Sequence, residues 1–326
     1  MVDRRTFVRA TLAAVIAPLK ANAQTATAVR RIGWLAGAGP DTPAVRQAID
    51  ARVRELGWVE GENLRVEYRF ANGRAELLKP LAEELVRLKV EVIVTVGTQA
   101  AFAAKNATTS IPIVMYGAGD PVRSGLVASL ARPGGNITGY SLLSPELEAK
   151  TLALIREVLP AAERVGVLLN STNPMSAVRQ RENEPIYRAL GLKPITVAVA
   201  SESELENAIA EMARQRAQTL VVTDDALFYL HRVRIMDAAL RHALPTLGED
   251  TDMLAAGAML TYCISLSEQY RRYASYLDRI LRGANPADLP IEQPTQFELG
   301  VNLRTAKALG VTIPPSLRLR ADEVIQ

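Results

Sequence analysis

The stretch of sequence that decides the fold is residues 111–141, IPIVMYGAGDPVRSGLVASLARPGGNITGYS. Its apolar run over 113–116 predicts a buried strand, and Gly117-Ala118-Gly119 predicts a tight turn directly after it. Residues 137–140 predict a further strand. A strand–turn–helix–strand unit of this kind places polar groups at the carboxyl end of a strand, where open α/β sheets bind ligands.

The helix of this unit is expected over residues 121–130, because Asp120 can cap backbone N–H groups and Pro121 suits the first helical position. The same pairing recurs at Thr42-Pro43, Ser144-Pro145 and Asn173-Pro174. Ser144-Pro145 is interpreted only as the start of a helix, with no role in ligand binding. At the other three positions the helix follows a strand directly, so its free N–H groups and positive dipole end suit an anion such as a carboxylate.

Strand and helix patterns alternate through the first half of the chain and then begin again. Apolar runs over 31–35, 64–68 and 90–96 precede the opening stretch, and similar runs over 165–169, 195–199 and 219–222 follow it. A long helix is expected over 227–242. Two successive series of this kind predict the α/β class, with two doubly wound parallel-sheet lobes.

The composition excludes several classes of protein. At 326 residues with 48% hydrophobic content, the chain is long enough for two domains, each with its own core. The formal net charge of +3 belongs to residues 1–23, which contain four basic side chains and one acidic side chain. Since the remainder is formally neutral, we expect no nucleic-acid partner.

Residues 1–23 are interpreted as an export signal that is removed. A charged start precedes an apolar run over 10–19, and Ala21-Asn22-Ala23 fits a cleavage site. The run is too short to span a bilayer. Arg4-Arg5 fits a twin-arginine signal, and an ordinary Sec signal remains an alternative. Cys263 is the single cysteine, so no intramolecular disulfide can form in the periplasm, where we expect the protein.

Motifs for cofactors and catalysis are weak. Gly37-x-Gly39-x-x-Thr42 lacks the third glycine of the dinucleotide fingerprint, and there is neither a G-x-x-x-x-G-K-[ST] loop nor a G-x-S-x-G elbow. His231 and His242, the only histidines, fall on one predicted helix among charged neighbours without the companions of a metal site. We therefore expect no cofactor, no metal and no enzymatic activity.

Two positions after predicted strands suit the ends of a zwitterionic ligand. Gly97-Thr98-Gln99 begins a helix whose N-terminus either holds a carboxylate or is merely capped. Asp224-Asp225 follows the strand over 219–222, where a carboxylate either balances a ligand ammonium or caps the next helix.

A resemblance to a known family rests on two long motifs. Residues 97–141, GTQAAFAAKNATTSIPIVMYGAGDPVRSGLVASLARPGGNITGYS, resemble the signature of ABC-transporter substrate-binding proteins of the tryptophan/tyrosine-type family. Residues 283–326, GANPADLPIEQPTQFELGVNLRTAKALGVTIPPSLRLRADEVIQ, are similar to that family's C-terminal pattern. With the β/α series between them, the resemblance covers essentially all of the mature chain.

The resemblance implies a type I periplasmic-binding-protein fold, with a three-segment hinge and a ligand in the cleft between two lobes. It implies a first lobe of residues 30–142 and 266–284, and a second lobe of residues 143–265 and 285–326. It further implies a monomer that delivers a small-molecule ligand, an amino acid or an aromatic or aliphatic acid, to an ABC permease in the inner membrane. A ligand-sensing protein for a receptor and a Rossmann-type enzyme remain alternatives.

The resemblance also implies a set of ligand-binding positions. Amino-acid binders of this fold hold the ligand carboxylate after the third and fourth strands and the ammonium on an acidic group, for which Asp224 is the candidate. Tyr262 matches a family tyrosine at the cleft edge, although Cys263 follows it where the family commonly has glycine. The whole candidate set is Ala38, Thr98, Gln99, Gly117, Asp120, Tyr140, Asn170, Asn173, Asp224 and Tyr262.

Overall fold

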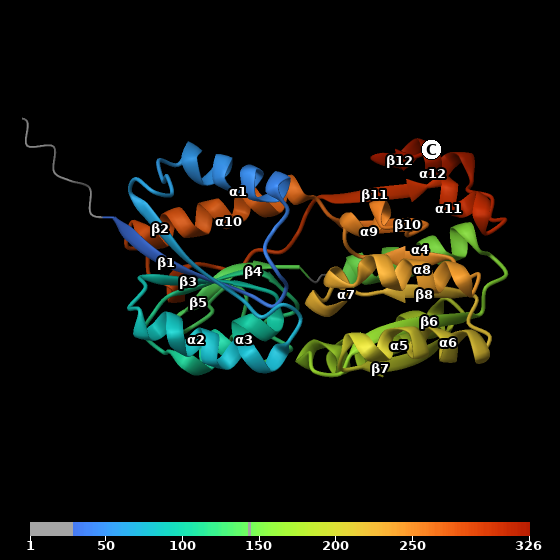
Figure 1. The fold of residues 1–326 in the computed structure, drawn as a ribbon, viewed down its shortest axis with the longest axis horizontal. Helices are drawn as coiled ribbons and strands as arrows, with labels where there is room; N and C mark the ends of the chain where they lie inside the picture. The colour runs from blue at the N-terminus through green and yellow to red at the C-terminus, as the bar shows by residue number, and fades with distance from the viewer. Residues whose placement is uncertain (1–28, 143–144) are drawn as a thin grey trace, which may run out of the picture.

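The computed structural model describes residues 29–142 and 145–326, which form two lobes side by side along the long axis of the molecule (Figure 1). The predicted export signal over residues 1–23 lies outside the described residues, and so does Ser144 of the Ser144-Pro145 pair. Each lobe is a sheet with helices on both faces, which confirms the predicted α/β class with two doubly wound lobes.

The first lobe is built on five parallel strands. In spatial order they are β2 (Leu64–Phe70), β1 (Arg30–Ala36), β3 (Val92–Val96), β4 (Ile113–Ala118) and β5 (Ile137–Ser141). One face is covered by α1 (Pro43–Glu55) and α10 (Leu266–Leu281), and the other by α2 (Leu78–Arg87) and α3 (Thr98–Ala107). Because both faces are covered, the inner strands are almost wholly apolar.

Small residues allow close approach in this lobe. On α3, the side chains of Ala100, Ala101 and Ala104 are fully buried, which brings the helix close to the sheet. Gly139 has a φ of +133°, and a Cβ there would lie 2.3 Å from the carbonyl oxygen of Met115. Glycine is therefore required where β5 pairs with β4.

The second lobe is built on seven strands. In spatial order they are β12 (Glu323–Ile325), β11 (Phe297–Asn302), β10 (Leu260–Ile264), β9 (Thr246–Gly248), β8 (Thr219–Val222), β6 (Arg164–Asn170) and β7 (Lys193–Val199). One face carries α4 (Pro145–Val158), α5 (Pro174–Ala189), α11 (Leu303–Ala308) and α12 (Pro315–Arg320). The other carries α6 (Leu205–Arg214), α7 (Ala226–Leu230), α8 (Arg232–Arg241) and α9 (Asp252–Ala255). The prediction of wholly parallel sheets is wrong for β11, which runs antiparallel to β10.

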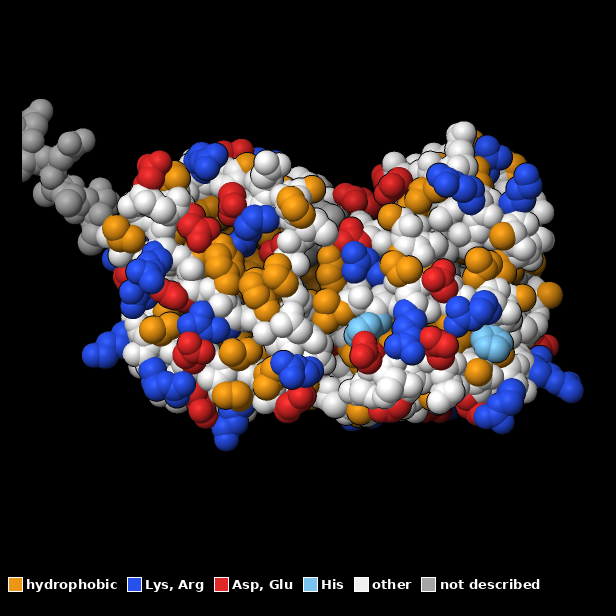
Figure 2. Space-filling model, viewed as in Figure 1, with side chains coloured by type: hydrophobic (Ala, Val, Ile, Leu, Met, Phe, Trp, Pro, Cys, Tyr) orange, Lys and Arg blue, Asp and Glu red, His pale blue; other side chains and the backbone are white. Residues whose placement is uncertain are grey.

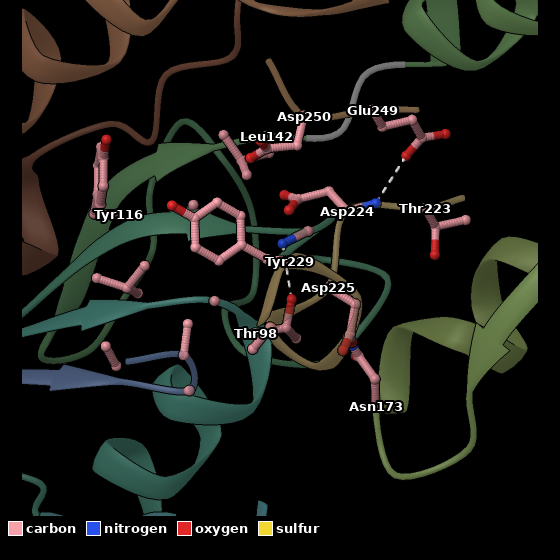
Figure 3. Close-up of a pocket in the computed structure, with 18 of the residues that line it drawn as sticks. Thr98, Tyr116, Leu142, Asn173, Thr223, Asp224, Asp225, Tyr229, Glu249 and Asp250 are labelled. Atoms are coloured by element: carbon pink, nitrogen blue, oxygen red, sulfur yellow. Dashed lines mark hydrogen bonds between the residues drawn. The ribbon is translucent and has the colours of Figure 1, made fainter. Parts of the chain in front are cut away.

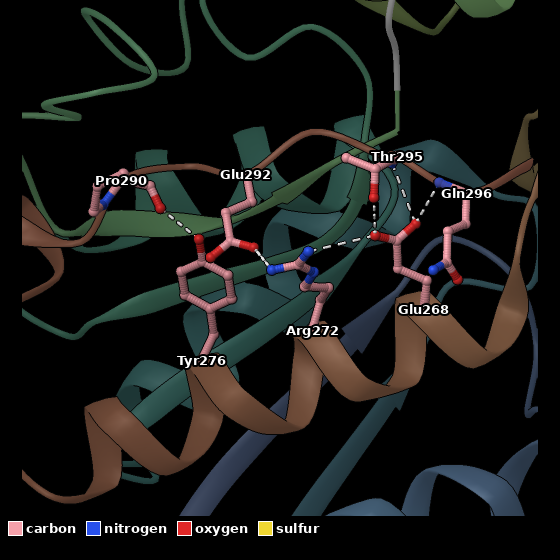
Figure 4. Close-up of polar contacts among 7 residues, drawn as sticks. All are labelled: Glu268, Arg272, Tyr276, Pro290, Glu292, Thr295 and Gln296. Carbon is pink, nitrogen blue, oxygen red and sulfur yellow. Dashed lines mark hydrogen bonds and ion pairs between the residues drawn. The ribbon is translucent and has the colours of Figure 1, made fainter.

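The chain passes between the lobes after β5, between β10 and α10, and before β11. Helix α10 holds the last of these passages through Glu268, which is 1% exposed. Its carboxylate accepts hydrogen bonds from the backbone N–H of Thr295 (3.3 Å) and Gln296 (2.9 Å) and from the hydroxyl of Thr295 (2.8 Å) (Figure 4). One and two turns further along α10, Arg272 pairs with Glu292 and the Tyr276 hydroxyl donates to the carbonyl of Pro290.

This network places residues 285–292 on the first lobe, whereas the resemblance implied a return to the second lobe at 285. Leu289 packs in the core between the first sheet and α10. The backbone N–H of Ser141 donates to the carbonyl of Glu292 at 2.9 Å. The last passage therefore lies after Glu292.

Two predicted helices differ from the structure. Residues 121–130 form turns instead of a helix, because Gly125 takes a left-handed conformation (φ +80°) one turn after Pro121. The helix expected over 227–242 is divided into α7 and α8 at His231, whose φ of −104° and ψ of 18° leave helical geometry. The bend directs α7 toward the first lobe, where Leu230 lies against Gly39 and Gly73.

Candidate ligand-binding site between the lobes

A cavity of about 210 Å³ lies between the lobes, at the carboxyl ends of their strands. The first lobe lines it with the ends of β1, β3 and β4 and the turns that follow them, and the second lobe with the ends of β6, β8 and β9 (Figure 3). Figure 2 shows the surface hollowed between the lobes, with acidic and basic side chains intermixed over the rest of that face. Among the described residues that line the cavity, by contrast, acidic side chains outnumber basic ones.

The structure brings six of the ten predicted site residues to the cavity wall: Ala38, Thr98, Gln99, Gly117, Asn173 and Asp224. The other four, Asp120, Tyr140, Asn170 and Tyr262, do not line it. The six come from the carboxyl ends of five different strands, or from the residues just after them, as the α/β pattern predicts.

The two predicted tyrosines face protein instead of the cavity. Tyr140 is fully buried and packs with Leu147 and Ile264. The ring of Tyr262 stacks on Phe297 of the neighbouring strand β11, with ring centroids 5.7 Å apart. This aromatic partner on β11 holds the Tyr262 ring against the sheet. The next two residues of the strand, Cys263 and Ile264, line the cavity instead.

The other two residues outside the wall have structural partners. Asp120 accepts hydrogen bonds from the backbone N–H of Val122 (3.0 Å) and Arg123 (2.9 Å), which closes the turn that replaces the expected helix. Asn170 is buried and donates to Asp225 at 2.9 Å. Both therefore shape the loops around the cavity.

The first-lobe wall presents the N-terminus of α3. Gly97 precedes the helix with φ +89° and offers no side chain to cap it, so the first N–H groups of the helix face the cavity with the positive end of its dipole. The Thr98 hydroxyl accepts from the backbone N–H of Gly119 at 2.9 Å, which joins the turns after β3 and β4. This end of the cavity suits a negatively charged group.

The second-lobe wall presents adjacent carboxylates with different roles. Asp225 caps α7 by accepting from the backbone N–H of Leu227 (2.9 Å), and it also accepts from the side chains of Asn170 (2.9 Å) and Asn173 (2.7 Å). The carboxyl group of Asp224 accepts no hydrogen bond from the described residues and points into the cavity (Figure 3).

The side chain of Asp224 is exposed to the space of the cavity, whose walls come from both lobes. The protein walls on both sides of the cavity limit the hydration of this carboxyl group. Together with the negative charges of Asp250, Glu249 and Asp225, this raises the pKa of Asp224 to about 8. A cation placed beside Asp224 would reverse these effects. This carboxyl group is therefore suited to a ligand ammonium.

Glu249 and Asp250, at the end of β9, were not predicted as site residues. Glu249 forms an ion pair with Arg179 of α5 and accepts from the backbone N–H of Asp224 at 3.2 Å. Asp250 accepts from the backbone N–H of Asp252 at 2.8 Å. Burial and the nearby charge of Asp252 raise the pKa of Asp250 to about 6.

Three further tyrosines line the cavity and were also missed. Tyr116 lies near the end of β4, Tyr229 lies on α7 and Tyr270 lies on α10. The Tyr229 hydroxyl donates to Asp252 at 2.9 Å, so its ring stands across the cavity (Figure 3). Tyr116 is the last aromatic residue of a predicted strand, and its position at the strand end was the one sequence signal for this group.

The lobes are in contact around the cavity. The side-chain amide of Gln99 donates to the Thr172 hydroxyl at 2.8 Å, and Arg123 pairs with Glu182 at 3.0 Å. A Cβ added to Gly119 would lie 2.9 Å from Met175 of the second lobe. The structure is therefore a closed form in which a ligand would be enclosed.

Other kinds of site are not formed by the described residues. Within the two described ranges, no cluster of histidine, cysteine and acidic side chains has the arrangement of a metal site. No helix in the same ranges has the length and apolar character needed to cross a membrane.

The fold and the interlobe cavity define a type I periplasmic binding protein, in which two lobes close on a small molecule. The family described as ABC transporter substrate binding protein matches residues 38–325. The chain belongs to this family, whose members are binding proteins and not enzymes.

Three known proteins illustrate the likeness. A tyrosine-binding protein of Clostridioides difficile is 25% identical over 286 residues, which cover 87% of this chain and 80% of the relative. The structure of an ABC domain from Streptococcus pneumoniae in complex with L-Trp is 24% identical, with a TM-score of 0.84 over 91% of this chain and 99% of that one. A ligand-free, open substrate-binding protein of Clostridium difficile is also 24% identical over 91% of this chain and all of the other, but its TM-score is 0.64. The shape of this chain is thus nearer to the complex than to the open form.

Proposed function

We propose that this chain is the extracytoplasmic solute-binding protein of an ABC importer and that its ligand is an amino acid. The ligand would enter between the open lobes, be enclosed as they close, and pass to a permease that recognises the closed form. The export-signal pattern of residues 1–23 supports a location outside the cytoplasm. One relative is a tyrosine-binding protein and another was solved in complex with L-Trp, and both support an amino acid as the ligand class.

The observation that carries the proposal is the opposed chemistry of the two walls. The uncapped N-terminus of α3 faces the cavity from the first lobe, and the carboxyl group of Asp224 faces it from the second. An α-amino acid carries a carboxylate for one wall and an ammonium for the other. An aromatic or aliphatic acid without an amine would meet the acidic wall with no compensating charge.

The test is calorimetric titration of the purified protein with the common L-amino acids and with amine-free carboxylic acids. We expect saturable binding of at least one amino acid and none of the amine-free analogue of the same ligand. The Asp224→Asn variant should lose affinity by about tenfold or more, because a charge-assisted hydrogen bond is replaced by a neutral contact.

A matched control is available in the same lobe. Asp237 is an exposed side chain of α8 away from the cavity, so Asp237→Asn makes the same chemical change without touching the ligand. It should bind as the unaltered protein does. Equal affinity of Asp224→Asn and Asp237→Asn would remove the role assigned to Asp224.

A further inference from the structure

The cavity between the lobes is lined by many more acidic than basic side chains. Six carboxylates are among its described lining residues, namely Asp41, Asp224, Asp225, Glu249, Asp250 and Asp252. Among the same lining residues Arg179 is the one cation. Which ligand the cavity selects depends on how many of these carboxylates have a partner within the protein.

Four of the six have partners. Asp225 is held as the cap of α7, and Glu249 is paired with Arg179. Asp252 lies 3.8 Å from the guanidinium of Arg232 and accepts from the Tyr229 hydroxyl. Asp41 lies 3.8 Å from the guanidinium of Arg46. These carboxylates shape and support the wall.

Asp224 and Asp250 form no ion pair with the described residues, although the charges of Arg179 and Arg232 act on them from further away. Their carboxyl groups lie near one another, beside the ring of Tyr229 (Figure 3), and the charge of Asp250 is the largest electrostatic influence on Asp224 after poor hydration. Two carboxylates held close together in a poorly hydrated space repel each other. A ligand that brings one positive charge relieves only part of this repulsion.

A second observation points to an absent polar ligand at the same place. Tyr270 of α10 lines the cavity and is only 6% exposed, yet its hydroxyl has no hydrogen-bond partner among the described residues. After burial, the charges of Asp41, Asp252, Asp250 and Glu298 raise its pKa. A buried hydroxyl without a partner is costly, so a bound group that accepts or donates there is expected.

We propose that the cavity selects a basic amino acid, whose α-ammonium and side-chain cation pair with Asp224 and Asp250. This inference rests on the proposed function and names the ligand class of the same site. The rings of Tyr116 and Tyr229 line the space between the walls, where they suit an alkyl stem and a cation over an aromatic face. The carboxylate of the ligand takes the N-terminus of α3.

The test compares ligands that differ by one charge. L-Lysine is titrated against L-norleucine, which has the same carbon chain without the side-chain ammonium, and L-arginine against its neutral isostere L-citrulline. L-Tyrosine and L-tryptophan are measured beside them. The basic member of each pair should bind at least about tenfold more tightly than its neutral counterpart. It should also bind more tightly than either aromatic amino acid.

The variant Asp250→Asn keeps an oxygen to accept from the backbone N–H of Asp252 and removes only the charge. It should lower the affinity for the basic amino acid about tenfold without lowering that for its neutral counterpart, whereas Asp237→Asn should change neither. If the neutral counterparts or the aromatic amino acids bind as tightly as the basic ones, or if Asp250→Asn has no effect, the assignment of a basic ligand is wrong although an amino acid still binds. If no amino acid binds, the proposed function itself fails.

Discussion

At the scale of single residues, Asp224 and Asp225 show how position after a strand separates two chemically identical side chains. Asp225 turns back onto its own lobe and accepts three hydrogen bonds. Two of them come from Asn170 at the end of β6 and Asn173 in the loop that follows it. Asp224, one residue earlier, points to the opposite side and reaches the cavity. The first stabilises the start of α7, and the second is available to a ligand.

The raised pKa of Asp224 predicts that amino-acid affinity increases with pH. In the ligand-free protein the carboxyl group titrates at about 8, so much of it is protonated at neutral pH, and binding of an ammonium requires the proton to leave. Asp250, Glu249 and Asp225 favour the proton, while Arg179 opposes it. Calorimetry between pH 6 and pH 8 should show binding that becomes tighter as the pH rises. It should also show proton release on binding that is largest at pH 6 and decreases toward pH 8.

The same titration on Asp224→Asn provides the control, because asparagine does not ionise in this range. Its weaker affinity should depend much less on pH than that of the unaltered protein. A flat profile for both proteins would mean that Asp224 is already ionised in the ligand-free cavity.

Part of this site could be predicted from the sequence and part could not, and the physical reason differs from residue to residue. Thr98, Gly117 and Asp224 lie at or just after the ends of apolar strands, and parallel strands bring the residues at their carboxyl ends to one edge of a sheet. Glu249 and Asp250 come after β9, which has three residues and a weak pattern, so they were missed. Tyr262 was placed at the cavity by the resemblance, and its ring instead stacks on Phe297, a partner distant in sequence.

At the scale of elements, α10 belongs to the first lobe although it follows ten strands of the chain, and it secures the last passage between the lobes. Glu268 is the centre of this attachment. Burial alone would raise the pKa of Glu268, but hydrogen bonds from Thr295 and Gln296 and the charge of Arg272 outweigh it and lower the pKa. The ionised form therefore stabilises the folded protein.

Replacement of Glu268 by alanine should lower the free energy of unfolding by about 2 kcal/mol, since it removes three hydrogen bonds from Thr295 and Gln296 to a buried carboxylate. Because the pKa is lowered by folding, this contribution is present above the ordinary value of 4.5 and is lost as the pH falls below it. Urea unfolding at neutral and acidic pH measures both effects. Glu62→Ala, which alters an exposed side chain, is the control and should change little.

The element that sequence reasoning misjudged is the segment over 121–130. Asp120 does accept backbone N–H groups, as a helix cap would, and Leu126 packs into the first-lobe core as a helical residue would. Gly125 nevertheless ends the turn after Pro121, and the backbone N–H of Ile291, from the far end of the chain, donates to the carbonyl of Leu130 at 2.8 Å. A contact of that sequence separation cannot be inferred from a local pattern.

At the scale of the whole molecule, ligand binding depends on how closely the two lobes can approach. Glycines of the first lobe lie where the second lobe touches it: a Cβ on Gly37 would lie 3.0 Å from the Cβ of Ala226 of α7. Gly37 has no positive φ, so alanine fits its backbone and conflicts only with the closed arrangement.

Gly37→Ala should therefore weaken ligand binding about fivefold or more while the lobes remain folded, because overpacking at a close contact costs roughly 1 kcal/mol. Small-angle X-ray scattering with saturating ligand should show a larger radius of gyration than for the unaltered protein. Gly135→Ala places the same methyl group where no atom lies within 4 Å, and it should bind normally. Normal closure of Gly37→Ala would show that the contact with α7 does not limit approach.

The most direct test of the central claim is a crystal structure of the protein with its tightest-binding amino acid. The account predicts one ligand between the lobes, with its carboxylate at the N-terminus of α3 and its α-ammonium within hydrogen-bond distance of Asp224. A ligand bound with the opposite polarity, or at a place where neither α3 nor Asp224 contacts it, would contradict the account.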